Sequence, residues 1–317
     1  MPEPSAIEGA FRSSERRLWQ LCYRMTGVAA DADELVQDAF VRALEAPAPL
    51  AGADLERWLV RVATNLSLDR LRRRKRRRYV GPWLPSPIET PEPDAEHADT
   101  RDAAERYEQA EEVSFAFLIA LEALSPRARA VLLLADVLDY PATEIAAILE
   151  TSEGNVRVLH HRARRVLDEH HADPFPSADA LGRQRDALGR FVFCMMQQDA
   201  DGLAALLADD VRSLTDGGGR YTALREPLIG RERVVRFHLE TARRRAPIST
   251  SELRFVNGAL ALVVETRPLR PQMAPRLVLR CEVDASGRIS ELHTVLAPAK
   301  LTAMRFRQSG AGDAVAD

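Results

Sequence analysis

The sequence predicts a multidomain protein with two all-α units, the second carrying a helix-turn-helix, followed by an α+β domain. Its 317 residues exceed the usual size of one domain. Apolar residues recur at helical spacing through the first half, and near the C-terminus they alternate with polar residues as in half-buried strands. These patterns predict the following division: a helical unit at 10–80, a linker at 81–112, a helical unit at 113–171, an α+β domain at 180–300 and a tail at 301–317.

The composition is that of an ordinary globular protein, with 46% hydrophobic and 29% charged residues. No apolar run reaches the ~20 residues that a membrane-spanning helix needs, and the first residues lack the apolar core of a signal peptide. The three cysteines, Cys22, Cys194 and Cys281, have neither a disulfide framework nor a metal-binding spacing. We therefore expect a cytoplasmic protein that holds no metal and no cofactor.

A basic block ends the first helical unit. Residues 1–80 hold 15 basic and 11 acidic residues, and every residue from Arg72 to Arg78 is basic. The expected helix that precedes this block carries Trp58 and Leu59 on its apolar face. Like charges at the end of an amphipathic helix favour contact with a polyanion such as nucleic acid. The alternative interpretation is a solvated helix end.

An acidic linker follows over residues 81–112, with 10 acidic and 2 basic residues. Its prolines disfavour helix, so an extended segment is expected. Trp83 lies in this linker, and we expect it to dock on another part of the chain. The acidic charge shields a basic surface of the protein or serves only solubility. A third alternative, which depends on the family resemblance described below, is that the linker follows a basic channel of its partner.

The strongest local pattern lies in the second helical unit. A short helix is expected over 142–149, followed by a turn at 150–153 and a second helix from Gly154 to Arg165. Arginine and asparagine side chains face outward on the second helix, where they can bond base edges in the major groove or bind phosphates. The pattern favours a DNA-binding helix-turn-helix, and the alternative is a structural helical hairpin with a solvated basic face.

The C-terminal domain is expected to combine helices with a meander of strands. The pattern predicts helix over 180–210, and Asn257-Gly258 marks a two-residue hairpin turn. Two further strands are expected over 277–283 and 288–296. The last residues, from Gln308, are small and polar, so they are expected to be disordered.

Three segments together resemble the bacterial extracytoplasmic-function sigma factors of the sigma-70 family. Residues 31–40, DADELVQDAF, are similar to that family's polymerase-binding helix. Residues 58–65, WLVRVATN, with the basic run that follows them, are similar to its promoter-melting region. The helix-turn-helix, with NVR at 155–157 and HRAR at 161–164, is similar to its second conserved domain. The motifs occur in the family's order, and the resemblance covers residues 10–171.

The resemblance implies contacts with core RNA polymerase, through its clamp helices and flap, and with promoter DNA. The implied clamp-helix contacts, which combine charged and apolar side chains, are Asp33, Glu34, Gln37 and Phe40. Phe40 could instead lie in the protein's own core. The implied minus-ten contacts are Arg61, Asn65, Arg70, Arg72, Arg73 and Arg74, with Asn65 holding a flipped base. The implied minus-thirty-five contacts are Asn155, Arg157, His161, Arg162 and Arg164.

The remainder of the chain is similar to sigma factors that have a C-terminal SnoaL-like extension. The linker motif WLPSP starts at Trp83, and a second motif, DGGGR, starts at Asp216. A third motif is only partly present, as APAKL at 297–301. The resemblance implies an NTF2-like cone, a curved sheet whose helices form a pocket. It further implies regulation in cis, without a separate anti-sigma protein, through contacts of Trp83, Leu84 and Pro85 with Asp216, Gly217, Gly218, Gly219 and Arg220.

Two other functions remain open for the C-terminal domain and the helix-turn-helix. Proteins with the SnoaL-like fold include enzymes, and Asp216, His238 and His293 are the candidate acid–base residues here. We expect no catalysis, and a pocket that senses an unknown small molecule is the more plausible role. An ordinary one-component DNA-binding regulator would explain residues 113–300 but leaves residues 10–80 without a role.

Overall fold

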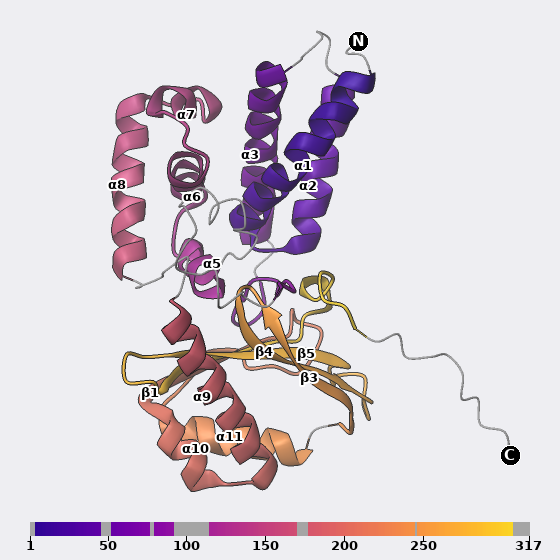
Figure 1. Ribbon diagram of the computed structural model, residues 1–317, viewed down its shortest axis with the longest axis vertical. Helices are drawn as coiled ribbons and strands as arrows, with labels where there is room; N and C mark the ends of the chain where they lie inside the picture. The colour runs from indigo at the N-terminus through magenta and orange to yellow at the C-terminus, as the bar shows by residue number, and fades with distance from the viewer. Residues whose placement is uncertain are drawn as a thin grey trace, which may run out of the picture.

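The computed structural model places two groups of helices on one side of a six-stranded sheet and three helices on the other side (Figure 1). The parts of the chain that it describes are residues 4–45, 52–76, 79–91, 114–169, 177–244 and 246–306. The expectations for most of the acidic linker, for Arg77 and Arg78 of the basic block and for the tail after residue 306 lie outside these residues.

The first group consists of three long helices whose apolar faces meet. They are α1 (Pro4–Thr26), α2 (Ala29–Leu44) and α3 (Gly52–Arg76). Gly27 ends α1 with a φ of +67°, a left-handed conformation that glycine adopts without a side-chain clash. This turn brings α2 back against α1, and the buried side chains Leu21, Val36 and Leu59 come from the three helices in turn.

Serine side chains cap the first two helices of the second group. Ser114 and Ser125 accept hydrogen bonds from backbone N–H groups in the first turns of the helices they precede. The elements are α5 (Phe115–Glu122), α6 (Pro126–Leu132), the π-helical turn η1 (Leu133–Val137), α7 (Ala142–Ile148) and α8 (Glu153–Glu169). Helices α7 and α8 form the helix-turn-helix, and Glu150 turns the chain between them with a φ of +50°.

The two helical groups share one hydrophobic core. Leu35 and Leu59 of the first group belong to the same buried cluster as Leu121, Val131 and Ile145 of the second. Helix α3 packs on α6, and α1 packs on α5 and α6. The sequence pattern alone predicts two separate units, because it reports which face of a helix is apolar and not which helix covers that face.

The C-terminal domain is a mixed sheet with helices on one face, as Figure 1 shows. The strand order is β2-β1-β6-β5-β4-β3, with β1 and β6 parallel and the other neighbours antiparallel. The elements are α9 (Ala178–Gln197), α10 (Ala200–Leu206), β1 (Leu207–Asp216), β2 (Leu228–Ile229), α11 (Arg231–Arg244), β3 (Ile248–Val256), β4 (Ala259–Thr266), β5 (Arg276–Val283), β6 (Ile289–Val295) and the 3-10 turn η2 (Pro298–Lys300).

One expectation for this domain is wrong, and one of its helices was not predicted. The helix predicted over 180–210 is interrupted at Gln198, whose φ is +57°, and strand β1 begins at Leu207. Helix α11 was not predicted, because its sequence is highly charged and only one narrow stripe of it is buried. Strand β1 does not alternate cleanly between buried and exposed residues, since its last four residues are all buried, so the period-two signal is weak there.

The two faces of the sheet are covered by different parts of the chain. Leu279, Cys281 and Leu292 point to the face that packs against Phe191 of α9 and Val234 of α11. On the opposite face, Val278 and Val295 belong to a cluster with Leu84 of the linker and Phe115 of α5. The sheet therefore separates a core of its own domain from an interface with the helical groups.

All three cysteines are buried and unpaired. In the described ranges, no helix has the length and apolar character needed to cross a membrane. The same residues contain no group of three or more histidine, cysteine or acidic side chains placed to hold a metal ion.

One prediction concerns His238, a buried residue of α11 whose Nε2 lies 3.0 Å from Ser213 Oγ of β1. Burial lowers the pKa of this imidazole to about 4. Below its unfolded-state pKa of about 6.5 the unfolded chain takes up a proton that the native site excludes, so stability present above that pH is lost as the pH falls toward 4. The loss is on the order of 3 kcal/mol. In urea unfolding between pH 4.5 and 7.5, we expect His238→Gln, which can still bond Ser213, to flatten the acid-side slope. An unchanged slope would contradict the assignment.

Candidate functional site

The junction between the helical groups and the C-terminal domain is centred on the buried carboxylate of Asp216. This residue ends β1 and is completely buried. Its Oδ2 accepts a hydrogen bond from the Leu84 N–H at 2.8 Å, and its Oδ1 accepts bonds from the Tyr79 hydroxyl and, at 3.0 Å, from the Gly218 N–H. A buried carboxylate is stabilised only when such donors surround it, so the linker and the sheet depend on one another here.

Lys300, which lies near the C-terminal end of the domain's sequence, is the last partner of Asp216. Its Nζ lies 2.5 Å from Asp216 Oδ2 and also donates to the Leu84 carbonyl. The ammonium group is 4.2 Å from the ring centroid of Trp83 and 4.7 Å from that of Tyr79, within the range of cation–π attraction. Burial lowers the pKa of Lys300 to about 8, while the adjacent Asp216 carboxylate acts in the opposite direction. The cation thus joins the linker to the sheet.

Trp83 docks on the turn between α1 and α2. A Cβ atom placed on Gly27 would lie 2.2 Å from Cη2 of the Trp83 indole, so the ring rests directly on the glycine backbone. The guanidinium of Arg74, from the end of α3, lies 4.5 Å from the same ring centroid. The Ser86 N–H donates to the Gly27 carbonyl at 2.8 Å. The expectation that Trp83 docks on another part of the chain is therefore confirmed, and its docking site is this turn.

A second set of contacts fixes the linker a few residues later. The Tyr23 hydroxyl of α1 donates to the Ser86 carbonyl at 2.6 Å and accepts from Asn257 Nδ2 at 3.1 Å. Asn257 Oδ1 accepts from the Ile88 N–H at 3.2 Å, and its backbone N–H donates to the Ile88 carbonyl at 2.9 Å. Glu89 then pairs with Val256 as an isolated antiparallel bridge. The β3–β4 hairpin turn thus contacts the linker and α1 together.

The second predicted motif, residues 216–220, lies only partly in the junction. Gly218 and Gly219 have φ values of +59° and +73°, and a Cβ on them would approach Ala297 at 2.9 Å and Val80 at 3.4 Å. These glycines therefore permit a close approach of the linker and the η2 segment. Arg220 is exposed on the surface, and Pro85 is buried in the linker itself.

The predicted polymerase-binding residues divide into an exposed set and one buried residue. Asp33, Glu34 and Gln37 lie on the exposed face of α2. Phe40 points inward, with 6% of its surface exposed, and belongs to the core shared by the helical groups. Val41 and Leu44, which are each 50% exposed, lie on the outward side of the same helix instead. The core position considered for Phe40 is thus the one observed.

Several predicted minus-ten residues bind other parts of this chain. Arg61 lies 3.1 Å from Glu150 in the helix-turn-helix turn, and this pair is largely exposed. Arg70 donates to Asp31 at 2.5 Å and to Glu34 at 2.7 Å. The Arg61–Glu150 pair is exposed on both sides and contributes little free energy, so it is compatible with exchange for a phosphate, whereas the side chains of Arg70 and Asp31 are mostly buried.

The other members of the minus-ten set differ in exposure. Arg74 is engaged on three sides: it donates to the Thr26 carbonyl at 2.8 Å, forms an ion pair with Glu122 of α5 and lies over Trp83. Asn65 is half-buried, and Arg73 is exposed. Arg72 is exposed and pairs with Asp69 of its own helix at 2.7 Å.

The predicted minus-thirty-five residues lie along α8. Arg157, His161 and Arg162 are exposed, and Arg157 pairs with Glu153 one turn earlier at 2.8 Å. The Asn155 amide donates to Thr151 Oγ1 at 2.8 Å at the start of the helix. Arg164 donates to both carboxylate oxygens of Asp136, at 2.9 and 2.8 Å.

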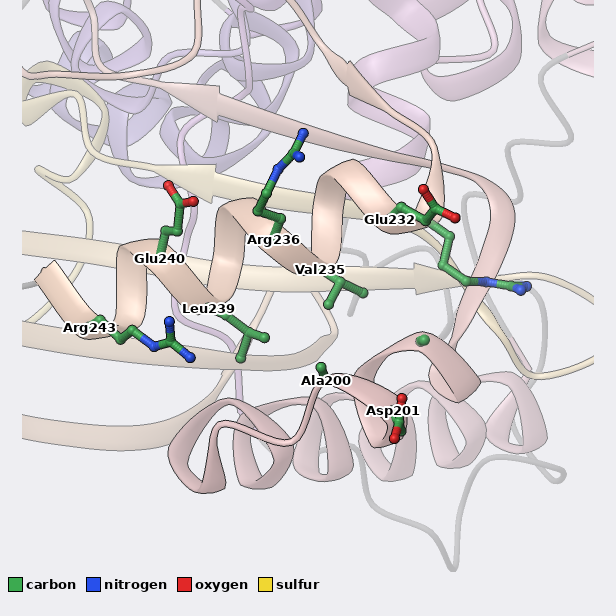
Figure 2. A pocket seen from close by; sticks show the side chains of 10 residues that line it. Ala200, Asp201, Glu232, Val235, Arg236, Leu239, Glu240 and Arg243 are labelled. Atoms are coloured by element: carbon green, nitrogen blue, oxygen red, sulfur yellow. The ribbon is translucent and has the colours of Figure 1, made fainter.

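The acid–base candidates of the C-terminal domain do not converge. Asp216 lies in the junction, His238 lies on the helix-covered face of the sheet, and His293 lies on the opposite face beside Glu291. A groove of about 420 Å³ opens between α10 and α11, with Val235, Leu239 and Ala200 among its lining residues and charged side chains around them (Figure 2). None of the three candidates lines this groove, and a small-molecule ligand for the domain stays a prediction.

Four residues of the junction were not singled out as contact residues from the sequence. Tyr79 and Tyr23 carry no local signal, because their partners lie 137 and 63 residues away along the chain. Asn257 was identified only as a turn residue. Lys300 lies in the partly matching motif at 297–301, and its position there was the one available signal.

The sequence comparisons agree with the two helical groups. The family described as Sigma-70 region 2 matches residues 10–77, and the family described as Sigma-70, region 4 matches residues 115–167. These ranges correspond to α1–α3 and to α5–α8. The fold and these matches define a protein of the sigma-70 class.

Whole-chain relatives specify the class further. The ECF RNA polymerase sigma factor SigJ of Mycobacterium tuberculosis is 32% identical over 94% of this chain and 94% of its own length. A probable ECF RNA polymerase sigma factor, SigI, of the same organism is 28% identical over 98% of this chain and its full length. The crystal structure of M. tuberculosis SigJ matches with a TM-score of 0.69 at 29% identity, covering 93% of this chain and 98% of SigJ. The chain belongs to the extracytoplasmic-function RNA polymerase sigma factors.

The contact between Trp83 and Gly27 leads to a prediction with an internal control. Gly27→Ala adds a methyl group against the indole and also strains a left-handed backbone, whereas Gly52→Ala strains a similar backbone, φ +54°, with no atom within 4 Å. We expect Gly27→Ala to lower the free energy of unfolding by about 1–3 kcal/mol more than Gly52→Ala does. Urea unfolding followed by tryptophan fluorescence measures this difference. Equal losses in the two variants would show that Trp83 does not depend on Gly27.

Proposed function

We propose that this protein binds core RNA polymerase and directs it to promoters, and that its C-terminal domain regulates this activity in cis. In this proposal α2 binds the polymerase clamp helices, α3 contacts the minus-ten element, and α8 reads the minus-thirty-five element. The junction around Asp216 holds both helical groups against the sheet. The observation that carries the proposal is this buried junction. In it the linker between the two sigma regions is bonded to the first region and to the sheet, and its Leu84 shares an apolar cluster with Phe115 of the second region.

The exposed face of α2 supports the polymerase contact. Carboxylates and an amide at Asp33, Glu34 and Gln37 lie beside the exposed apolar side chains Val41 and Leu44. An acidic surface with apolar side chains at one end suits a basic helical partner, since charge guides encounter while apolar contacts add affinity. We propose that Val41 and Leu44 take the anchoring role that the sequence resemblance gave to Phe40.

The internal pairing of basic residues supports regulation by closure. Arg61 and Arg74 are proposed DNA contacts, and both are held by acidic residues of the other helical group, Glu150 and Glu122. A phosphate and a carboxylate compete for the same guanidinium donors. Closure therefore opposes DNA binding, and release of the junction favours it, without any need for a separate anti-sigma protein.

We infer that the C-terminal domain acts by binding and not by catalysis. A general acid or base must lie within hydrogen-bond reach of a bound substrate, and none of the three candidates lines the groove between α10 and α11. Asp216 is surrounded by donors of the linker, and His238 and His293 lie on opposite faces of the sheet. This separation supports a regulatory role for the domain.

The polymerase surface is tested with full-length variants. We expect Glu34→Ala/Gln37→Ala to weaken core polymerase binding by about tenfold or more while the unfolding free energy changes little, because both side chains are exposed. Phe40→Ala should instead lower stability by about 3–5 kcal/mol, since it empties a core position. Co-purification with core polymerase and urea unfolding measure the two effects. The control pair is Gln197→Ala/Glu240→Ala on the exposed surface of the C-terminal domain. Retained binding by the α2 double variant would contradict the assignment.

The regulatory role is tested at Asp216. Asp216→Asn removes the charge that balances Lys300, so the closed arrangement should weaken and affinity for core polymerase should rise by about tenfold. Asp209→Asn is the matched control, because Asp209 lies on the same strand with 84% of its side chain exposed. Equilibrium binding to core polymerase measures both variants, with circular dichroism to verify the fold. An unchanged or reduced affinity in a folded Asp216→Asn protein would refute inhibition by this junction.

A further inference from the structure

The sheet of the C-terminal domain has one apolar face and one face that carries buried charge. The face toward α9 and α11 is a continuous apolar cluster. The opposite face, which α5 covers, carries Arg280 at 3% exposure and His293 at 0%. These two residues are directly paired in register across β5 and β6.

The buried guanidinium of Arg280 is poorly satisfied. Its Nη2 lies 3.0 Å from Glu282 Oε1, but within the described chain its Nε and Nη1 are buried without a hydrogen-bond partner. The guanidinium carbon lies 4.4 Å from the ring centroid of Phe115 in α5. A ring face attracts a cation but accepts no conventional hydrogen bond, so the two N–H groups retain much of their desolvation cost.

His293, on the neighbouring strand β6, is also a buried polar side chain that is only partly hydrogen-bonded. Its Nε2 lies 2.8 Å from Glu291 Oε2, while its Nδ1 is buried and has no hydrogen-bond partner among the described residues. Its ring centroid lies 5.6 Å from that of Phe115. One aromatic side chain therefore covers two incompletely bonded polar groups.

Among the residues that the structure describes, the ion pairs of this polar cluster lie within the sheet itself. Arg280 pairs with Glu282 on β5, His293 pairs with Glu291 on β6, and Glu291 also pairs with Arg212 of β1 at 3.0 Å. Phe115 contacts the His293 ring and the Arg280 guanidinium without forming an ion pair. Departure of α5 would break none of these ion pairs, and water would then satisfy the open donors.

The face that α9, α10 and α11 cover differs in how completely its polar atoms are bonded. In the described part of the chain, the buried side-chain atoms that lack partners include none from α9, α10 or α11. Permanent interfaces leave few buried polar atoms unbonded, whereas a surface that is hydrated in a second state tolerates them. The two faces therefore differ in the way expected for a permanent and a reversible contact.

We propose that the face of the sheet carrying Arg280 and His293 is a reversible docking surface whose occupant is α5 of the same chain. In the closed state Phe115 covers the polar cluster, and in the open state water does. The unsatisfied donors limit the stability of the closed state, so that region 4 can leave the sheet without unfolding the domain. The inference rests on the proposed regulation in cis and specifies which contact opens.

Thiol labelling of the intact protein tests this proposal. Val278→Cys places a thiol on the α5-covered face of β5, where Val278 shares a cluster with Phe115. Cys281 lies on the same strand and the other face, where it is fully buried in the apolar cluster, so it serves as an internal control for global unfolding. With iodoacetamide and peptide mass analysis, we expect the thiol at 278 to react at least about tenfold faster than Cys281, because opening requires less than global unfolding.

Two further substitutions, each made in the Val278→Cys background, are expected to change the labelling rate at position 278 in opposite directions. Arg280→Met replaces the unsatisfied guanidinium by an apolar chain, so labelling at 278 should slow by about tenfold, since replacement of a buried charge by an apolar group often stabilises an interface. Phe115→Ala should accelerate labelling at 278 without changing that of Cys281. Arg288→Met, an identical substitution at an exposed position of the same domain, should leave both rates unchanged.

Two outcomes would overturn the proposal. One is a thiol at 278 that reacts no faster than Cys281 in both the parent and Phe115→Ala, because the contact would then open only with global unfolding. The other is faster labelling at 278 in a folded Arg280→Met protein. None of these measurements contains polymerase, so they stand apart from the proposed function. The proposed function is tested separately by adding core RNA polymerase, which should accelerate the same labelling. If polymerase does not accelerate it, the proposed function is contradicted and the docking-surface proposal is not.

Discussion

A single buried carboxylate, Asp216, constrains the relation between the three parts of this protein. It lies at the end of β1, and its donors come from the linker, from the following turn and from Lys300. A carboxylate removed from water needs all these partners, so none of them can leave independently. The linker held in this way also carries Trp83 onto Gly27, which sets where the first helical group lies on the sheet.

The closed arrangement uses the same residue types that a sigma factor directs at DNA. Arg74 binds the end of α1, the indole of Trp83 and Glu122 at once, and Arg129 donates to the Met25 carbonyl at 2.6 Å and to Glu122 at 2.7 Å. These arginines satisfy the free carbonyls at the end of α1. Basic side chains thus contribute to the contact between the two sigma regions.

Sequence patterns predicted most of the fold, because helical periodicity, serine caps and the Asn-Gly turn are local signals. They failed where burial is narrow, as in α11, or where a strand follows a helix directly, as at Leu207. For the candidate site, Trp83 and Asp216 were identified through motifs. Tyr79, Tyr23 and Asn257 were missed, since their roles arise only from contacts between distant segments. Phe40 lies in the core because its position on α2 faces α1 and α3, which a motif does not report.

The order of the junction residues along the chain has a consequence for biosynthesis. Leu84, Asp216 and Lys300 meet in space, yet 132 residues separate the first two and 84 separate the last two. A ribosome therefore releases both sigma regions well before Lys300, which completes this junction. Each newly made molecule passes through an interval in which both helical groups exist without the sheet that packs against them, and the length of that interval is set by the rate of translation.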